Sequence, residues 1–365
     1  CEHAKTTKTS HEFKHIKGLE LLDENKKLVN TGYGSTVSLD AMWDFDYEDI
    51  EKAHGTLDHI IRLAKPEGFK NIWYRDEPSL DEGLAVATLD VSKGCVARCT
   101  FCHRWTKGLR HVPIPELTRR MKFLVDVHNV RYVDINAESF GNDKRWLAGF
   151  LDMMKSFNLT WRANGVRANT FDEDWIKKCK EAGCTYLGYG NETGSVSMLK
   201  IMEKKVKLED NYNAMKWTIR NGLKTGVALV LGMPGESPST VRETIEYTKF
   251  CVTLSPEFDP NNLSINYAQA LPGTALYEYG RSHGLIGRSL KGEEDYLISI
   301  SDRNAHDETT TLNFTEYPTL IHRTWRPRIT IETNYHYVKT FGLDHYRRKL
   351  PQSHALMYEA SGFFA

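Results

Sequence analysis

The feature of this sequence that most constrains its fold is a regular alternation that begins near residue 87. From there, short apolar runs alternate with amphipathic segments at intervals of roughly 25 to 40 residues, which is typical of βα units repeated around a parallel sheet. We expect six strands, at residues 87–92, 132–138, 160–164, 186–192, 225–231 and 263–270. The fifth run, TGVALVL, is almost continuously apolar, as expected for a strand that is covered on both faces.

The segments on either side of this alternation are less regular. Residues 1–86 are interpreted as a linker or N-terminal segment, in which 47–64 could form one helix. Residues 291–365 are rich in His, Tyr, Arg and Trp, and a break at 325–327 separates two helix-like stretches. We therefore expect an N-terminal segment, a βα domain over 87–290, and a helical C-terminal extension over 291–365.

Composition excludes several functional classes. Forty-eight basic and 48 acidic residues leave no net charge, so nothing indicates a nucleic acid or an anionic membrane as partner. No apolar run is long enough to span a bilayer, and the first 30 residues have no signal-peptide core, so we expect a soluble, cytoplasmic protein. Because the chain begins with Cys1 rather than Met, we also expect that sequence is missing upstream.

Cysteine usage points to a reducing compartment and to one special loop. The chain has seven cysteines, an odd number that argues against a disulfide framework. Cys95, Cys99 and Cys102 lie within eight residues, directly after the first expected strand. In a parallel barrel, the loops that follow the strands line the face where catalytic groups collect. The remaining cysteines that fall on apolar patterns are interpreted as core residues: Cys179, Cys184 and Cys251.

The spacing of the three cysteines suits a particular metal centre. Three thiolates can each bind one iron of a cubane cluster, which leaves the fourth iron open to a substrate or cofactor. A structural zinc site would require four ligands, and the adjacent His103 is the candidate fourth ligand for that alternative. Zinc ligands usually come in two spaced pairs, however, and no second pair is visible.

The C-x3-C-x-Φ-C pattern, in which Phe101 precedes the last cysteine, resembles the radical S-adenosylmethionine superfamily. The resemblance implies a 4Fe-4S cluster on Cys95, Cys99 and Cys102 whose open iron chelates S-adenosylmethionine. It further implies reductive cleavage of that cofactor to a 5′-deoxyadenosyl radical, chemistry that side chains alone cannot supply. By the same likeness, Phe101 belongs among the cofactor-binding residues.

Further matches fall at the ends of later strands. In DINAES at 134–139, Glu138 takes the position that receives the methionine amino group in the family; the alternative is a solvated loop carboxylate. LGYGNETGS at 187–195 resembles the family stretch in which Glu192 would hold the ribose hydroxyls, although Asn191 and Thr193 depart from it. Lys204 falls where the family pairs a cation with the methionine carboxylate, unless it belongs to a solvated run of charges.

Two glycine-containing turns extend the likeness. LGMPGE at 231–236 resembles the G-x-P-G-E turn, where Gly232 lets the backbone approach the cofactor closely. NYAQALPGT at 266–274 matches the P-x-P-G-T stretch, except that leucine replaces its first proline. Three residues on the third strand or just after it are candidates for the pocket, without assigned roles: Arg162, Asn164 and Arg167.

Within the superfamily, the likeness favours the cobalamin-binding branch, because 18–32 looks like the linker that leads out of a cobalamin domain. The D-x-H-x-x-G cobalt loop is absent, so cobalamin would enter only through a missing upstream domain, if such a domain existed. We therefore expect a partial (β/α)6 TIM-like barrel that transfers a methyl group to an unactivated carbon. Its partners would be an unknown substrate and an electron donor such as flavodoxin or ferredoxin. The alternatives are cobalamin-assisted ring closure or rearrangement and, in a different class, a non-catalytic iron-sulfur or zinc-binding protein.

Overall fold

The computed structural model describes most of the chain from residue 85 onward and several shorter pieces before it. The described residues are 13, 15–22, 25, 28–32, 61–63, 85–103, 108–301 and 311–353. Contacts divide the chain into two compact units, Cys1–Thr56 and Leu57–Ala365.

In the first unit, the described residues contain a small antiparallel hairpin. It consists of β1 (Glu20–Leu22) and β2 (Leu28–Asn30). Outside the strands, the amide of Gly18 donates to the carbonyl of Gly32 at 2.6 Å. The segment that the sequence suggested as a linker is therefore a hairpin whose base is closed by hydrogen bonds.

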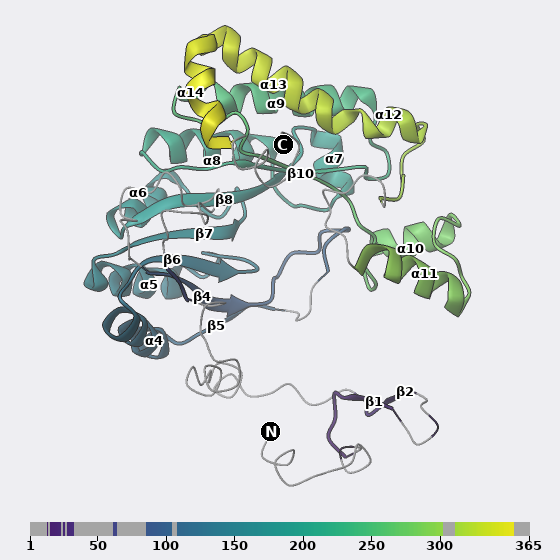
Figure 1. Cartoon of the computed structure of the whole chain (residues 1–365), viewed down its shortest axis with the longest axis horizontal. Coiled ribbons are helices and arrows are strands. Elements are labelled where there is room, and N and C mark those ends of the chain that lie inside the picture. Colours follow the sequence, from purple (N-terminus) through teal and green to yellow (C-terminus); the bar gives the residue numbers. More distant parts are fainter. Residues whose placement is uncertain are drawn as a thin grey trace, which may run out of the picture. The chain divides into compact units, whose positions relative to one another are not determined.

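A largely parallel sheet forms the centre of the second unit (Figure 1). Its order is β10-β9-β8-β7-β6-β4-β3, and the short β5 (Arg110–His111) pairs with β4. The parallel strands are β4 (Ala85–Lys93), β6 (Val130–Ala137), β7 (Thr160–Val166), β8 (Cys184–Glu192), β9 (Val227–Leu231) and β10 (Leu263–Tyr267). All six expected strands are confirmed. The helix considered over 47–64 is wrong at its end, since Ile61–Leu63 form β3, antiparallel to β4; residues 47–60 lie outside the described part.

Helices connect the parallel strands and lie along the outside of the sheet (Figure 1). They are α4 (Ile114–His128), α5 (Lys144–Phe157), α6 (Glu173–Glu181), α7 (Val196–Ile201), α8 (Leu208–Arg220) and α9 (Pro238–Val252). This alternation of parallel strands and outer helices confirms the predicted partial (β/α)6 TIM-like barrel.

Local signals set where these helices begin. Ser237 caps α9 and Pro238 occupies its first position, where a missing N–H costs nothing. The sequence also suggests a capping box that begins at Thr170, but that prediction is wrong. The cap of α6 is Asp172, whose carboxylate accepts the amide of Trp175 at 3.0 Å, so the helix starts at Glu173.

The C-terminal extension is helical, as expected, in the residues that the structure describes. It follows α10 (Ala275–Ser282) and consists of α11 (Leu290–Ser301), α12 (Thr319–Arg323), α13 (Trp325–Phe341) and α14 (Leu343–Ser353). Pro327 lies in the first turn of α13, where proline is tolerated. Helix α13 packs along α9, and the buried hydroxyls of Thr248 and Thr333 meet there at 2.6 Å.

Candidate functional site

The three predicted cluster cysteines lie on the loop that leaves the carboxyl end of β4. Gly94, with φ of +82°, turns the chain out of the strand. All three are free thiols; those of Cys95 and Cys99 are half-buried, and that of Cys102 is exposed. The amide of Cys102 donates to the carbonyl of Cys99 at 3.1 Å, which makes a tight turn between them. The three thiols thus lie on a short, structured loop beyond the carboxyl end of β4, the end of the strands at which the catalytic groups of parallel barrels collect.

Hydrogen bonds join this cysteine loop to the opposite side of the open sheet. At the end of α7, the amide of Thr100 donates to the carbonyl of Met202 at 3.0 Å and its hydroxyl donates to the carbonyl of Ile201 at 3.2 Å. Its own carbonyl accepts the amide of Leu276 in α10 at 3.0 Å. His103 Nδ1 lies 2.9 Å from the carbonyl of Pro272, and since a carbonyl only accepts, that nitrogen carries the proton. The loop is therefore held by elements that follow β8 and β10 as well as by β4.

The three thiols lie near one another, but they are not arranged as a metal-binding site. Although Cys102 has the most exposed surface of the three, partial desolvation of its thiol, followed by the nearby thiols of Cys99 and Cys95, raises the pKa of Cys102. Within the described ranges, no three His, Cys, Asp or Glu side chains lie close enough together to hold a metal ion. Three thiolates from one accessible loop have the donor chemistry that a cubane cluster requires, so the residues fit that group. For the zinc alternative, His103 would have to bind through Nε2.

Glu192 and Lys204 form a buried ion pair beside this loop. Only 8% of Glu192 and 7% of Lys204 is exposed, and the ammonium contacts the carboxylate directly. Glu192 ends β8 with φ of +63°, and the residues on both sides of Lys204, Glu203 and Lys205, are also left-handed. Such backbone is uncommon for non-glycine residues, and here it accompanies the inward position of the Glu192 and Lys204 side chains, whereas Glu203 and Lys205 stay exposed. The solvated alternative for Lys204 is therefore wrong.

Gly190 provides the space for this ion pair. A Cβ atom at Gly190 would lie 2.6 Å from Glu192 Oε1 and 2.9 Å from Lys204 Nζ. The two departures from the family stretch do not disturb it, because their side chains point to the helices. The side-chain amide of Asn191 donates to the hydroxyl of Tyr247 at 2.8 Å, and the hydroxyl of Thr193 makes a hydrogen bond with the hydroxyl of Thr244 in α9.

Arg167 connects the ion pair to the cysteine loop. Its guanidinium donates to the carbonyl of Lys204 and lies 3.9 Å from Cys99 Sγ. The other two pocket candidates, Arg162 and Asn164, make their contacts with residues of the neighbouring strands. Arg162 is buried against Asp134 at 3.1 Å, and Asn164 fills the space next to a glycine of β8.

The G-M-P-G-E turn after β9 has a closely packed backbone. Gly232 has φ of +80°, and its amide donates to the carboxylate of Glu236. Burial raises the pKa of Glu236 to about 8, an effect that the backbone hydrogen bonds from Gly232 and Met233 partly oppose. A Cβ atom at Gly232 would lie 2.6 Å from Nε2 of His322, which comes from α12. Sequence reasoning missed His322, and no spacing signal connects it to this turn.

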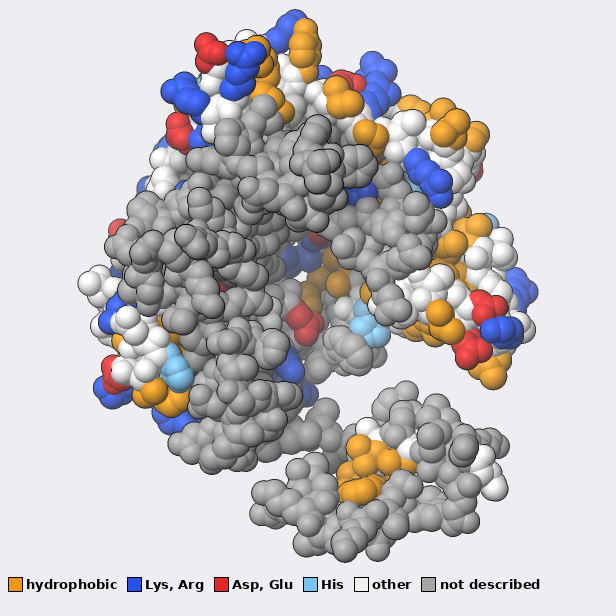
Figure 2. Space-filling view, in the orientation of Figure 1, with side chains coloured by type: hydrophobic (Ala, Val, Ile, Leu, Met, Phe, Trp, Pro, Cys, Tyr) orange, Lys and Arg blue, Asp and Glu red, His pale blue; other side chains and the backbone are white. Residues whose placement is uncertain are grey.

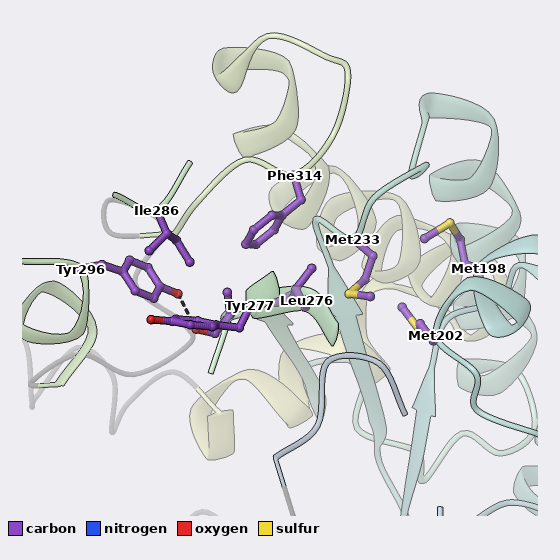
Figure 3. Close-up of a cluster of buried hydrophobic side chains, with 10 residues drawn as sticks. Met198, Met202, Met233, Leu276, Tyr277, Ile286, Tyr296 and Phe314 are labelled. Atoms are coloured by element: carbon purple, nitrogen blue, oxygen red, sulfur yellow. Dashed lines mark hydrogen bonds between the residues drawn. The ribbon is translucent and has the colours of Figure 1, made fainter. Parts of the chain in front are cut away.

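Phe101 packs against a cluster of buried apolar side chains; Figure 3 shows the cluster itself. The cluster combines three methionines with residues of the C-terminal part of the chain. Its members are Met198, Met202, Met233, Ala268, Ala270, Leu276, Tyr277, Ile286, Tyr296 and Phe314. Phe101 is half-buried against it, next to Cys102. The aromatic ring thus joins the cysteine loop to a buried cluster that contains three methionines, side chains that fill irregular spaces well.

Glu138 stands apart from these contacts. It follows β6 directly and is exposed, and its carboxylate makes no hydrogen bond or ion pair to the residues that the structure describes. Both interpretations of Glu138, as a cofactor ligand and as a solvated carboxylate, therefore stay open.

Figure 2 shows acidic, basic and histidine side chains gathered around a hollow in the face on view.

Comparisons with known proteins agree with this arrangement. Residues 89–248 match the model of the Radical SAM superfamily. An uncharacterized methyltransferase of Pyrococcus horikoshii is 26% identical over 215 residues, which are 56% of this chain and 44% of that protein. Cytidylyl-2-hydroxyethylphosphonate methyltransferase of Streptomyces wedmorensis is 25% identical over 178 residues, 46% of this chain and 33% of that protein. The chain thus matches less than half the length of either relative.

A solved structure shares the fold. The radical S-adenosylmethionine methyltransferase TsrM from Kitasatospora setae, solved with cobalamin and a [4Fe-4S] cluster bound, superposes with a TM-score of 0.50 at 16% identity. The superposition covers 76% of this chain and 51% of TsrM. Among the described residues, no helix is both long and apolar enough to cross a membrane. The cysteine loop lies inside the range 89–248 that matches the radical SAM model, so that range is similar to a radical SAM domain.

Proposed function

We propose that this chain is the catalytic part of a radical SAM methyltransferase that holds a 4Fe-4S cluster on Cys95, Cys99 and Cys102. The observation that carries the proposal is the position of these thiols. They lie on a loop held across the strand ends, with the buried Glu192–Lys204 pair connected to it through Arg167. A protein that merely stored a cluster would not need this second, internal pair of charges.

Each residue of the site has a role in binding. When bound, the cluster would supply one electron to the sulfonium of S-adenosylmethionine and so break a carbon–sulfur bond. The ammonium of Lys204 has three donors and the carboxylate of Glu192 has two oxygens, so each can keep its partner and still bind the cofactor. Lys204 would bind the methionine carboxylate and Glu192 the ribose hydroxyls. Phe101 and Gly232 would line the space between them.

Methyl transfer is favoured over other radical outcomes by the relatives. Two curated relatives are named methyltransferases, and TsrM is a methyltransferase that was solved with cobalamin. We include cobalamin as a cofactor of the whole protein on that basis, and methyl transfer to an unactivated carbon as its reaction. The described cysteines are all free thiols, which supports a reducing, cytoplasmic setting with flavodoxin or ferredoxin as electron donor.

Anaerobic reconstitution tests the cluster assignment. The wild-type chain should bind about four irons and show the brown absorption of a 4Fe-4S cluster. Cys102→Ala should lose the cluster, whereas Cys251→Ala, which removes a fully buried thiol elsewhere, should keep it. A colourless wild-type protein that carries one zinc per chain would overturn the proposal.

Product analysis tests the reaction. With S-adenosylmethionine and a strong reductant, the reconstituted chain should release 5′-deoxyadenosine, detected by mass spectrometry. Supplying methylcobalamin and candidate acceptors to the whole protein then distinguishes methyl transfer, seen as a mass gain of CH2 because a methyl group replaces a hydrogen, from ring closure, seen as a loss of hydrogen. A reconstituted protein that leaves S-adenosylmethionine intact would contradict the assignment.

A further inference from the structure

A cavity beside the cysteine loop shares Arg167 with the site described above, and its other lining residues have no role in that site. Its volume is about 390 Å³. Among the described residues, it is lined by Val96, Ala97, Arg98, Asn142, Arg167, Asn169 and Lys205. The lining therefore contains three cations and two side-chain amides, and none of these seven residues is acidic.

The positive charge of this cavity is not neutralised locally. Arg98 and Lys205 are exposed, and within the described part of the chain neither forms an ion pair with a carboxylate. The whole chain is neutral, so the cavity is a local excess of positive charge. The side-chain amide of Asn169 donates to the carbonyl of Lys205 at 3.1 Å, which holds that left-handed residue in place.

The cavity lies directly against a predicted cluster ligand. Val96, Ala97 and Arg98 are the residues between Cys95 and Cys99, so the wall of the cavity is the cysteine loop itself. Arg167, another lining residue, lies 3.9 Å from Cys99 Sγ. A redox group that approached here would be separated from the thiols by a single layer of protein.

We propose that this cavity is the docking surface for the electron donor, a small carrier protein whose acidic surface surrounds its redox centre. The proposal rests on the proposed function, since only a reducible cluster needs such a partner. One electron passes from the reduced carrier to the cluster; no bond forms or breaks, and no proton is transferred. Unpaired cations on this chain and carboxylates on the carrier would speed the association of the two proteins. Fast association suits electron-transfer pairs, whose interfaces are small and transient.

Charge reversal on the cavity tests the proposal, with flavodoxin as the probe. Arg98→Glu combined with Lys205→Glu should weaken flavodoxin binding to the apo chain by about tenfold or more at low salt, and the difference should shrink as salt rises. The matched control is Lys216→Glu, an exposed position on α8, which should bind flavodoxin as the wild type does. Biolayer interferometry measures these affinities without any cluster.

A second measurement uses the reconstituted enzyme. The double variant should reduce its cluster slowly with flavodoxin but at the wild-type rate with dithionite, a small reductant that needs no docking surface. Wild-type binding and reduction by flavodoxin in the double variant would overturn the proposal while the radical SAM function stands. If inorganic phosphate occupied the cavity at micromolar concentration and flavodoxin binding did not change, the cavity would be a small-anion site and the proposal would be wrong. Failure of the wild-type protein to assemble a cluster would instead refute the proposed function.

Discussion

Removing only one member of the Glu192–Lys204 pair should destabilise the protein far more than removing both. Both residues are more than nine-tenths buried and in direct contact. In Lys204→Met, the apolar stem is kept, but the Glu192 carboxylate loses its cation. Leaving one charge of a buried pair without its partner costs about 3–5 kcal/mol. Replacing both charges by Met removes the unpaired charge and should recover most of that loss, because apolar replacements of buried pairs are often neutral.

Urea unfolding of the cluster-free chain, followed by circular dichroism, measures these differences. We expect the midpoint of Lys204→Met to fall at an unchanged slope, and the midpoint of the Glu192→Met, Lys204→Met double variant to return toward the wild type. The difference between the double variant and the sum of the single variants gives the coupling between the two residues. A loss below about 1 kcal/mol in Lys204→Met, or a double variant as unstable as the two single losses added together, would refute the buried ion pair.

Three further predictions concern the rest of the site. The raised pKa of Glu236, about 8 against the usual 4.5, favours the protonated form in the folded state. Compared with Glu236→Gln, the wild type should therefore be most stable below pH 4.5. Its free energy of unfolding should then fall by about 1.4 kcal/mol per pH unit between pH 4.5 and pH 8. If both proteins lost stability in parallel as the pH rises, this prediction would be contradicted. Gly232→Ala should lower the free energy of unfolding by about 1–3 kcal/mol or more beyond the loss caused by Gly222→Ala. Both positions have positive φ, but only Gly232 would place a Cβ atom against His322. Equal melting curves for the two variants would contradict this contact. Glu138→Gln should weaken S-adenosylmethionine binding roughly ten- to a hundredfold, as expected for a lost charge-assisted hydrogen bond, with the iron content unchanged; wild-type affinity by electron-paramagnetic-resonance titration would identify Glu138 as a solvated carboxylate.

The sequence alone determined the barrel and the place of its cysteine loop. Periodicity is a local property, because a strand buried on both faces must be apolar along its length and an outer helix must be apolar on one face. For this reason all six strands were predicted near their observed bounds. The three cysteines are equally local, since they lie within eight residues and directly follow β4. Local reasoning was less accurate at boundaries, as the cap at Asp172 and the strand Ile61–Leu63 show.

Only the tertiary structure decided which of these side chains meet. The pairing of Glu192 with Lys204 depends on three left-handed residues and on the space left by Gly190, none of which has a spacing signal. His322 reaches the turn at Gly232 from an element 90 residues away in the chain, and Phe101 packs against a cluster that includes Phe314. Such contacts depend on how packed elements approach each other in space. The order of residues specifies which groups a chain carries, whereas the packing of helices and loops at the strand ends determines which of them act together.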